Sequence, residues 1–139
     1  MNVTDKSNIV GLATYNDEAG DYSVFSIKAI AISVDGNYLY TSSAGGHVVS
    51  MMNVTNKSEI VPLATHWDDS GSYSVQGIES LAISNDGNYL YTSSYSDDYV
   101  SIMNVTDKNS IVPLATYFDD EGAFSVEGVR AIAISVDGN

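Results

Sequence analysis

The chain has 139 residues, 44% of them hydrophobic, and its 18 acidic and 5 basic residues give a formal net charge of −13 at pH 7. The apolar content excludes a disordered chain, and no apolar run approaches the ~20 residues that cross a membrane as a helix. The negative charge argues against nucleic acid as a partner, because phosphate contacts need Lys and Arg. With no cysteine and no leader-like opening segment, the source compartment stays open, and a secreted or cell-surface parent remains one option.

A repeat of 51 residues organises the whole chain. The motif Met1-Asn-Val-Thr returns at Met52 and at Met103, and residues 1–51 share 31 identical positions with 52–102. Residues 52–88 share 23 identical positions with 103–139. A period of this length is typical of one supersecondary unit stacked on copies of itself. We therefore take 1–51, 52–102 and 103–139 as three repeats of one β-repeat region.

Four short strands are predicted within each period. In chain order they cover 27–34, 38–42, 47–54 and 60–66, with alternating side chains and many β-branched or aromatic residues. Asp35-Gly36 predicts a hairpin turn between the first two, because glycine tolerates positive φ. The turn glycines are Gly36, Gly87 and Gly138. Pro62 lacks an amide donor, so the fourth strand is expected at an edge.

Four antiparallel strands per repeat predict an all-β fold built from β-propeller blades, with a β-helix or an open sandwich as the alternative. Complete blades are expected at about 27–66 and 78–117. The segment AIAISVDGNYLYTSSYSDDYVSIMNV resembles the YVTN and lactonase-type propeller repeats. The matching residues are Ala82, Ser84, Asp86, Gly87, Leu90, Tyr91, Val100 and Ser101. This resemblance implies the propeller fold throughout the chain and leaves the ligand unknown.

The repeats are cut out of register with the blades, so partial blades are expected at both ends. Two blades and a fraction cannot close a ring, since propellers need about four to eight. We therefore interpret the chain as an engineered fragment or a truncated gene that forms a homo-oligomer, with a dimer favoured over a trimer or larger assembly. The predicted assembly strands carry Met1, Ile9, Val10 and Leu12 at one end and Ile132 and Ile134, within 129–136, at the other.

Acidic residues are expected on one rim of the ring, formed by the loops after the second and fourth strands, and the turn lysines Lys6, Lys57 and Lys108 on the opposite rim. Clustered carboxylates are calcium ligands, and the candidates are Asp68, Asp69, Asp119, Asp120 and Glu121. Their spacing is unlike that of a dedicated calcium loop, so we favour solvated surface charge and expect no cofactor. Trp67 and Phe118, beside these acids, are interpreted as loop anchors rather than as a ligand shelf.

Catalysis receives little support from the sequence. The two histidines, His47 and His66, occupy different repeat positions, which makes a His-based metal site hard to build. No serine has a histidine at a fixed partner position, so a nucleophilic triad is not expected. The prediction is therefore a non-catalytic scaffold or interaction module. The alternatives are a remnant of a metal-dependent lactonase-like propeller and a cell-surface adhesion repeat.

Overall fold

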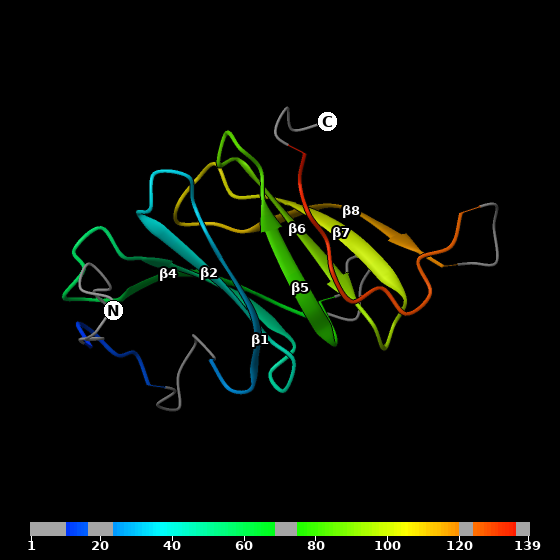
Figure 1. Cartoon of the computed structure of the whole chain (residues 1–139), viewed down its shortest axis with the longest axis horizontal. Helices are drawn as coiled ribbons and strands as arrows, with labels where there is room; N and C mark the ends of the chain where they lie inside the picture. Colours follow the sequence, from blue (N-terminus) through cyan, green and yellow to red (C-terminus); the bar gives the residue numbers. More distant parts are fainter. Residues whose placement is uncertain (1–10, 17–23, 69–74, 120–123, 136–139) are drawn as a thin grey trace, which may run out of the picture.

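Eight strands in two antiparallel sheets make up the computed structural model, which describes residues 11–16, 24–68, 75–119 and 124–135 (Figure 1). The first sheet, here called blade 1, contains β1 (Ile27–Ile32), β2 (Tyr38–Ser43), β3 (Val48–Asn53) and β4 (Val61–Trp67). The second sheet, blade 2, contains β5 (Ile78–Ile83), β6 (Tyr89–Ser94), β7 (Tyr99–Asn104) and β8 (Val112–Phe118). Strand order in each sheet follows the chain, and the described residues include no helix.

The predicted strands are confirmed to within two residues at each end. The first strand stops at Ile32 rather than at residue 34, because Ser33 already belongs to the turn: its amide donates to the Tyr38 carbonyl at 2.9 Å and its carbonyl accepts from the Gly36 amide at 2.8 Å. Gly36 and Gly87 have φ of +72° and +74°, the positive values that the turn requires. Gly138 lies outside the described residues.

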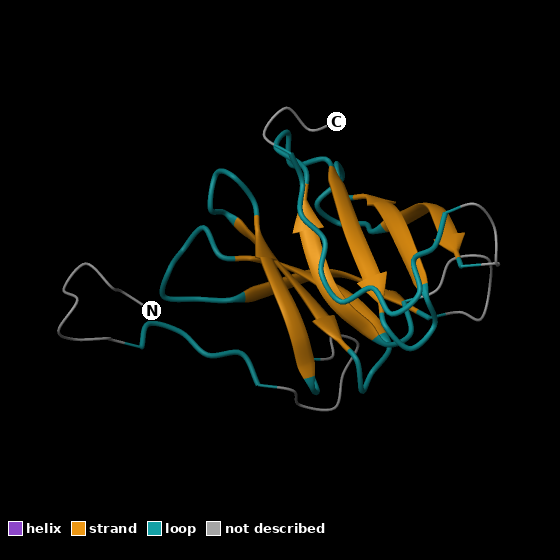
Figure 2. Ribbon diagram, turned by 45° about the vertical axis from the view of Figure 1, so that its right-hand side comes forward, coloured by secondary structure: helices purple, strands orange, loops and turns teal. Residues whose placement is uncertain are grey.

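The hydrophobic core lies between the two blades and not within either sheet. β5 of blade 2 packs against β1 and β2 of blade 1 (Figures 1 and 2). Tyr40 and Met51 of blade 1 are buried in one cluster with Leu90, Tyr99 and Met103 of blade 2. Burial of each such side chain contributes roughly 1.5–3 kcal/mol. Because a sheet on its own buries little, each blade is stabilised mainly by its neighbour.

The segment 129–135 lies beside β5 and runs parallel to it. The Ile132 amide donates to Ser80 Oγ at 3.2 Å, and Asn85 Nδ2 donates to the Ser135 carbonyl, also at 3.2 Å (Figure 1). This segment is therefore placed relative to blade 2 as β5 is placed relative to blade 1. It would be the innermost strand of a third blade.

The strands predicted at 129–136 and across Leu12 are not present in the single chain, which corrects that part of the prediction. The described residues 129–135 and 11–16 contain no strand. The physical reason is the lack of a ladder: β1 and β5 become strands by pairing with β2 and β6, and Ile132 and Ile134 have no such partner here. Met1, Ile9 and Val10 lie outside the described residues.

Candidate functional site

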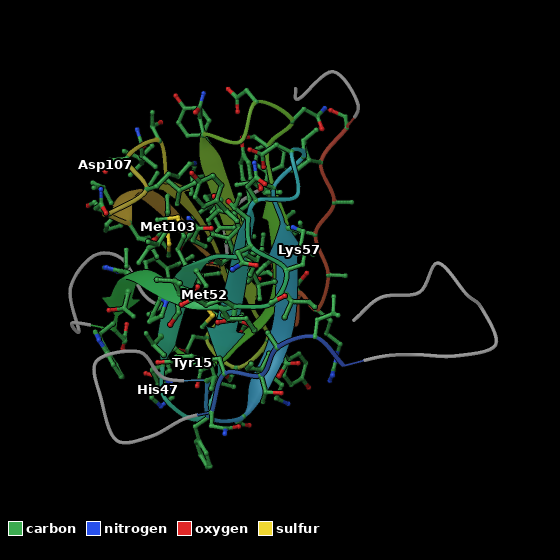
Figure 3. All side chains as sticks on the ribbon, turned by 90° about the vertical axis from the view of Figure 1, so that its left-hand side faces the viewer. Tyr15, His47, Met52, Lys57, Met103 and Asp107 are labelled. Carbon is green, nitrogen blue, oxygen red and sulfur yellow. The ribbon has the colours of Figure 1, made fainter. Side chains whose placement is uncertain are left out.

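An apolar groove of about 330 Å³ lies on the free side of blade 1, between that sheet and the segment 11–16. Figure 3 looks onto this side, which the segment 11–16 crosses near the label of Tyr15. The lining residues are Leu12, Ala13, Ile32, Gly36, Leu39, Val54, Lys57, Glu59 and Ile60. We call this surface the blade 1 groove. Leu12 borders it as a repeat equivalent of Leu63, which packs against the core from β4.

The sheet residues on the free side of blade 1 have their repeat equivalents on the face of blade 2 that is buried against blade 1. Ile30, at 61% exposed, is equivalent to Leu81, which is 8% exposed. Leu39 and Val54 of the groove are half-buried, whereas their equivalents Leu90 and Val105 are fully buried in the core. The groove therefore has the surface chemistry of an interface between blades, without a blade on it in the single chain.

The opposite face of blade 2 shows the complementary change. Tyr40 and Ala64 of blade 1 are buried under blade 2. Their equivalents in blade 2 are more open to solvent: Tyr91 is half-buried and Ala115 is exposed. The two ends of the molecule thus present the two different halves of one repeated interface.

The acidic rim predicted from the sequence is partly assembled in the structure. The amide of Asp68 donates to the His47 carbonyl at 2.9 Å, which places the loop after β4 beside the loop between β2 and β3. Burial raises the pKa of Asp97, and the charges of Asp68 and Asp98 raise it further. Carboxylates from both blades therefore share this rim, as the strand order predicted.

The calcium candidates that the structure describes take part in local hydrogen bonds. Asp68 Oδ1 accepts from the Val75 amide at 3.1 Å, and Asp119 Oδ2 accepts from the Ser125 hydroxyl. These contacts span the start and the end of the loop that follows β4 or β8. Across the described ranges, no three His, Asp or Glu side chains come together as a metal ion would need. Asp69, Asp120 and Glu121 lie outside those ranges.

The aromatic residues beside the acids differ in their contacts. The Phe118 ring lies 5.9 Å from the Tyr99 ring in an edge-on geometry, so Phe118, at the end of β8, packs on the neighbouring strand β7. Trp67 remains 42% exposed at the end of β4. The loop-anchor role of the two residues stays a prediction.

The opposite rim is held together by lysines that strap two turns of one blade. Lys57 Nζ donates to the carbonyls of Gly36 and Val54, the second at 2.8 Å. Lys108 Nζ makes the equivalent contacts with the carbonyls of Gly87 at 3.0 Å and Val105 at 2.6 Å. The hairpin turn and the turn after the third strand are thereby joined, on the rim where the sequence predicted the turn lysines. Lys6 lies outside the described residues.

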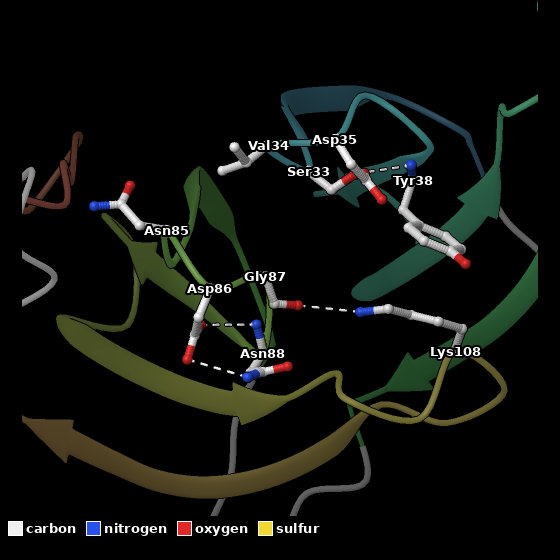
Figure 4. A pocket seen from close by; sticks show the side chains of 9 residues that line it. All are labelled: Ser33, Val34, Asp35, Tyr38, Asn85, Asp86, Gly87, Asn88 and Lys108. Carbon is white, nitrogen blue, oxygen red and sulfur yellow. Dashed lines mark hydrogen bonds between the residues drawn. The ribbon is translucent and has the colours of Figure 1, made fainter.

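A polar pocket of about 370 Å³ separates the hairpin turns of the two blades (Figure 4). Its carboxylates, Asp35 and Asp86, are held by their own turns: hydrogen bonds from Ser33 and from the amide of Asn37 lower the pKa of Asp35. Ser84 and Asn88 lower the pKa of Asp86 in the same way. Both acids are therefore ionised turn-forming groups, and the pocket is a by-product of two adjacent turns.

Sequence reasoning located the rims but missed the blade 1 groove. It also missed that Lys108 Nζ of blade 2 lies 5.1 Å from the centroid of the Tyr38 ring of blade 1. Aligning the repeats would have shown that the residues of the groove recur in blade 2, and so marked them as candidates for an inter-blade surface. Which copies are covered is not visible in the sequence.

Comparison with solved structures shows the fold class. A candidate 6-phosphogluconolactonase from Bacteroides fragilis matches with a TM-score of 0.65 and 21% identity, over 81% of this chain and 30% of that one. The periplasmic gluconolactonase PpgL of Pseudomonas aeruginosa matches with a TM-score of 0.59 and 20% identity, over 81% and 31%. The WD40 repeats of RRP9 match with a TM-score of 0.56 and 18% identity, over 70% and 27%.

The fold and these similarities define the chain as part of the β-propeller class. It spans about a third of the length of the solved structures that it matches. No family model matches the sequence, and no curated protein does. No helix in the described part of the chain is long and apolar enough to cross a membrane.

Proposed function

We propose that this chain is a non-catalytic interaction module of YVTN-type propeller repeats, whose partner is a second copy of itself bound head to tail. The observation that carries the proposal is the free face of blade 1. Ile30, on the same strand as the groove residue Ile32, is 61% exposed, whereas its equivalent Leu81 is 8% exposed on the face of blade 2 that packs against blade 1. A surface of this kind is stabilised when another blade covers it.

The segment 129–135 of a second copy is the proposed occupant of the blade 1 groove, at the end of the groove nearest the ring axis. Within one chain, the Ala29–Ala31 side of β1 packs on the core with blade 2. The equivalent Ala131 and Ala133 are exposed, while Ile132 and Ile134 are half-buried beside blade 2. The exposed alanines of one copy thus repeat the surface that fits the exposed isoleucines of the next.

A head-to-tail dimer would form a ring of about six blades, two complete blades from each copy and one composite blade at each junction. A six-bladed ring lies in the usual size range of propellers. The composite blade combines 129–135 of one copy with 11–16 of the other. It has fewer strands than the complete blades, so it is thinned or rearranged. Heterologous contacts close into rings only when the rotation permits, and otherwise extend into fibres.

Sedimentation velocity at micromolar concentration tests the proposal. We expect the 14.8 kDa chain to sediment as a dimer and the variant Ile30→Asp, whose site is exposed in the single chain, as a folded monomer. Val61→Asp is the matched control, because Val61 and its equivalent Val112 are exposed in both blades. A wild-type chain that is monomeric with native-like β circular dichroism would contradict the proposal.

Lactone hydrolysis is the second candidate function. Its support is that two of the solved structures with a similar fold are described as gluconolactonases. It is tested with gluconolactone and 6-phosphogluconolactone in the presence of calcium, magnesium or zinc. The interaction-module proposal expects rates equal to those in buffer. Turnover that requires metal and is removed by EDTA would favour the enzyme instead.

A further inference from the structure

The start of the segment 129–135 is held by the loop between β6 and β7. Asp98 Oδ1 accepts a hydrogen bond from the Gly128 amide at 2.7 Å. The Arg130 guanidinium carbon lies 3.8 Å from the centroid of the Tyr95 ring, which is a cation–π contact. Two side chains of blade 2 therefore fix the position at which the segment begins.

The rest of the segment is held by β5 and by the turn that follows it (Figure 1). Ser80 Oγ accepts a hydrogen bond from the Ile132 amide, and Asn85 Nδ2 donates to the Ser135 carbonyl, each at 3.2 Å. The contacts with blade 2 thus continue along the whole segment. All of the hydrogen bonds in this series are made to its backbone, which fixes the path of the chain beside β5.

We call the four side chains that make these contacts the clamp residues: Ser80, Asn85, Tyr95 and Asp98. Their repeat equivalents in blade 1 are Ala29, Val34, Ala44 and His47. Blade 1 holds β5 with these residues in place, because β5 pairs with β6 and buries Ile78 and Leu81. The segment 129–135 has no ladder in the described part of the chain, so the clamp residues supply the order that β5 obtains from its own sheet.

Resting on the proposed assembly, we propose that the clamp residues are the positioning residues of the junction between copies. They hold 129–135 as a preformed edge for blade 1 of the next copy, with the exposed Ala131 and Ala133 available to it. A free segment would lose conformational freedom on binding, and that loss weakens association. A segment already fixed along β5 loses little.

The test is the double variant Ser80→Ala/Asn85→Val, which places the blade 1 residues in blade 2. Ser80 is half-buried and Asn85 is exposed, so both blades are expected to fold. Sedimentation velocity should show a dimer dissociation constant about tenfold higher than that of wild type, which corresponds to ~1.4 kcal/mol.

Amide hydrogen exchange provides a second readout that is independent of assembly. It is measured in the Ile30→Asp background, which is expected to be a folded monomer. Adding the double variant to this background should speed exchange in 129–135 and leave exchange in β5–β8 unchanged.

Two matched controls isolate the clamp. Ser80→Thr keeps a hydroxyl at the same position and should match wild type in both readouts. Val34→Asn places the Asn85 side chain on the equivalent turn of blade 1, where β5 already has its ladder. It should change neither the dissociation constant nor the exchange of 129–135.

The outcomes separate the clamp from the assembly itself. Faster exchange together with a weaker dimer, both restored in Ser80→Thr, supports the positioning role. If the wild type forms a dimer and the double variant leaves either readout unchanged, the positioning role is overturned and the assembly stands. A wild-type chain that is monomeric at every concentration overturns the assembly and the junction role together.

Discussion

Lys108 of blade 2 lies over the ring of Tyr38 in blade 1, with its Nζ atom 5.1 Å from the ring centroid. Lys108 also donates to the carbonyls of Gly87 and Val105 in its own blade. Burial lowers the pKa of this lysine, against the opposing effect of the Asp35 and Asp86 carboxylates. A single side chain therefore joins two turns of blade 2 to the start of β2 in blade 1.

Lys108→Met is expected to lower the free energy of unfolding by more than Lys57→Met does. Both lysines strap equivalent turns, so the two substitutions remove the same backbone contacts. The difference reports what Lys108 has and Lys57 lacks, the Tyr38 ring and the attraction of the Asp35 and Asp86 carboxylates, and is expected at about 0.5–1 kcal/mol. Urea unfolding of the two variants measures it. Equal losses would show that these contacts contribute nothing.

Gly87→Val should destabilise the protein by about 1 kcal/mol or more, because valine disfavours the φ of +74° at this turn. A Cβ at this glycine meets no atom within 4 Å, so the cost comes from the backbone and not from a clash. Gly87→Asn is the control, since asparagine tolerates left-handed backbone. A thermal melt of the valine variant that matches wild type would contradict the turn geometry.

Tyr40→Phe is expected to stabilise the protein by about 1 kcal/mol, because the Tyr40 hydroxyl is buried with no hydrogen-bond partner among the described residues. Tyr91→Phe, at the half-buried equivalent position, should change stability little. Chemical denaturation of both variants provides the comparison. A loss of stability in Tyr40→Phe would indicate that the hydroxyl has a partner in solution.

The same tyrosine predicts a loss of stability in alkali. Burial raises the pKa of Tyr40 to about 12 in the folded chain, whereas an unfolded tyrosine titrates near 10. The folded state then holds the proton more tightly, so this contribution is fully present below about pH 10 and is lost as the pH rises through about 12. Unfolding free energies measured from pH 9 to 12 should fall less steeply in Tyr40→Phe. Identical slopes would refute the assignment.

Calcium is expected to act only as a salt. Asp68 and Asp119 already accept hydrogen bonds from their own loops, so millimolar calcium should raise the melting temperature slightly and magnesium should reproduce the rise. Asp68→Asn should leave this small response unchanged. A calcium-specific shift that EDTA reverses and Asp68→Asn removes would establish a metal site on the acidic rim.

Local sequence determined the strands, the turns and the two rims. Alternation from Ile78 to Ile83 and the Asp-Gly pairs act over a few residues, so they are readable from the chain alone. The 51-residue period added the strand order of each blade, and strand order decided that Asp68 and Lys57 lie on opposite rims.

Only the tertiary structure decided which copy of each repeated surface is covered. Ile30 and Leu81 have nearly the same chemistry and the same place in the repeat, yet one is exposed and the other buried, because only Leu81 has a blade packed on it. The segment 129–135 repeats the residue pattern of β5 but forms no strand, since a ladder needs a partner. Both outcomes depend on spatial neighbours, which a local pattern does not contain.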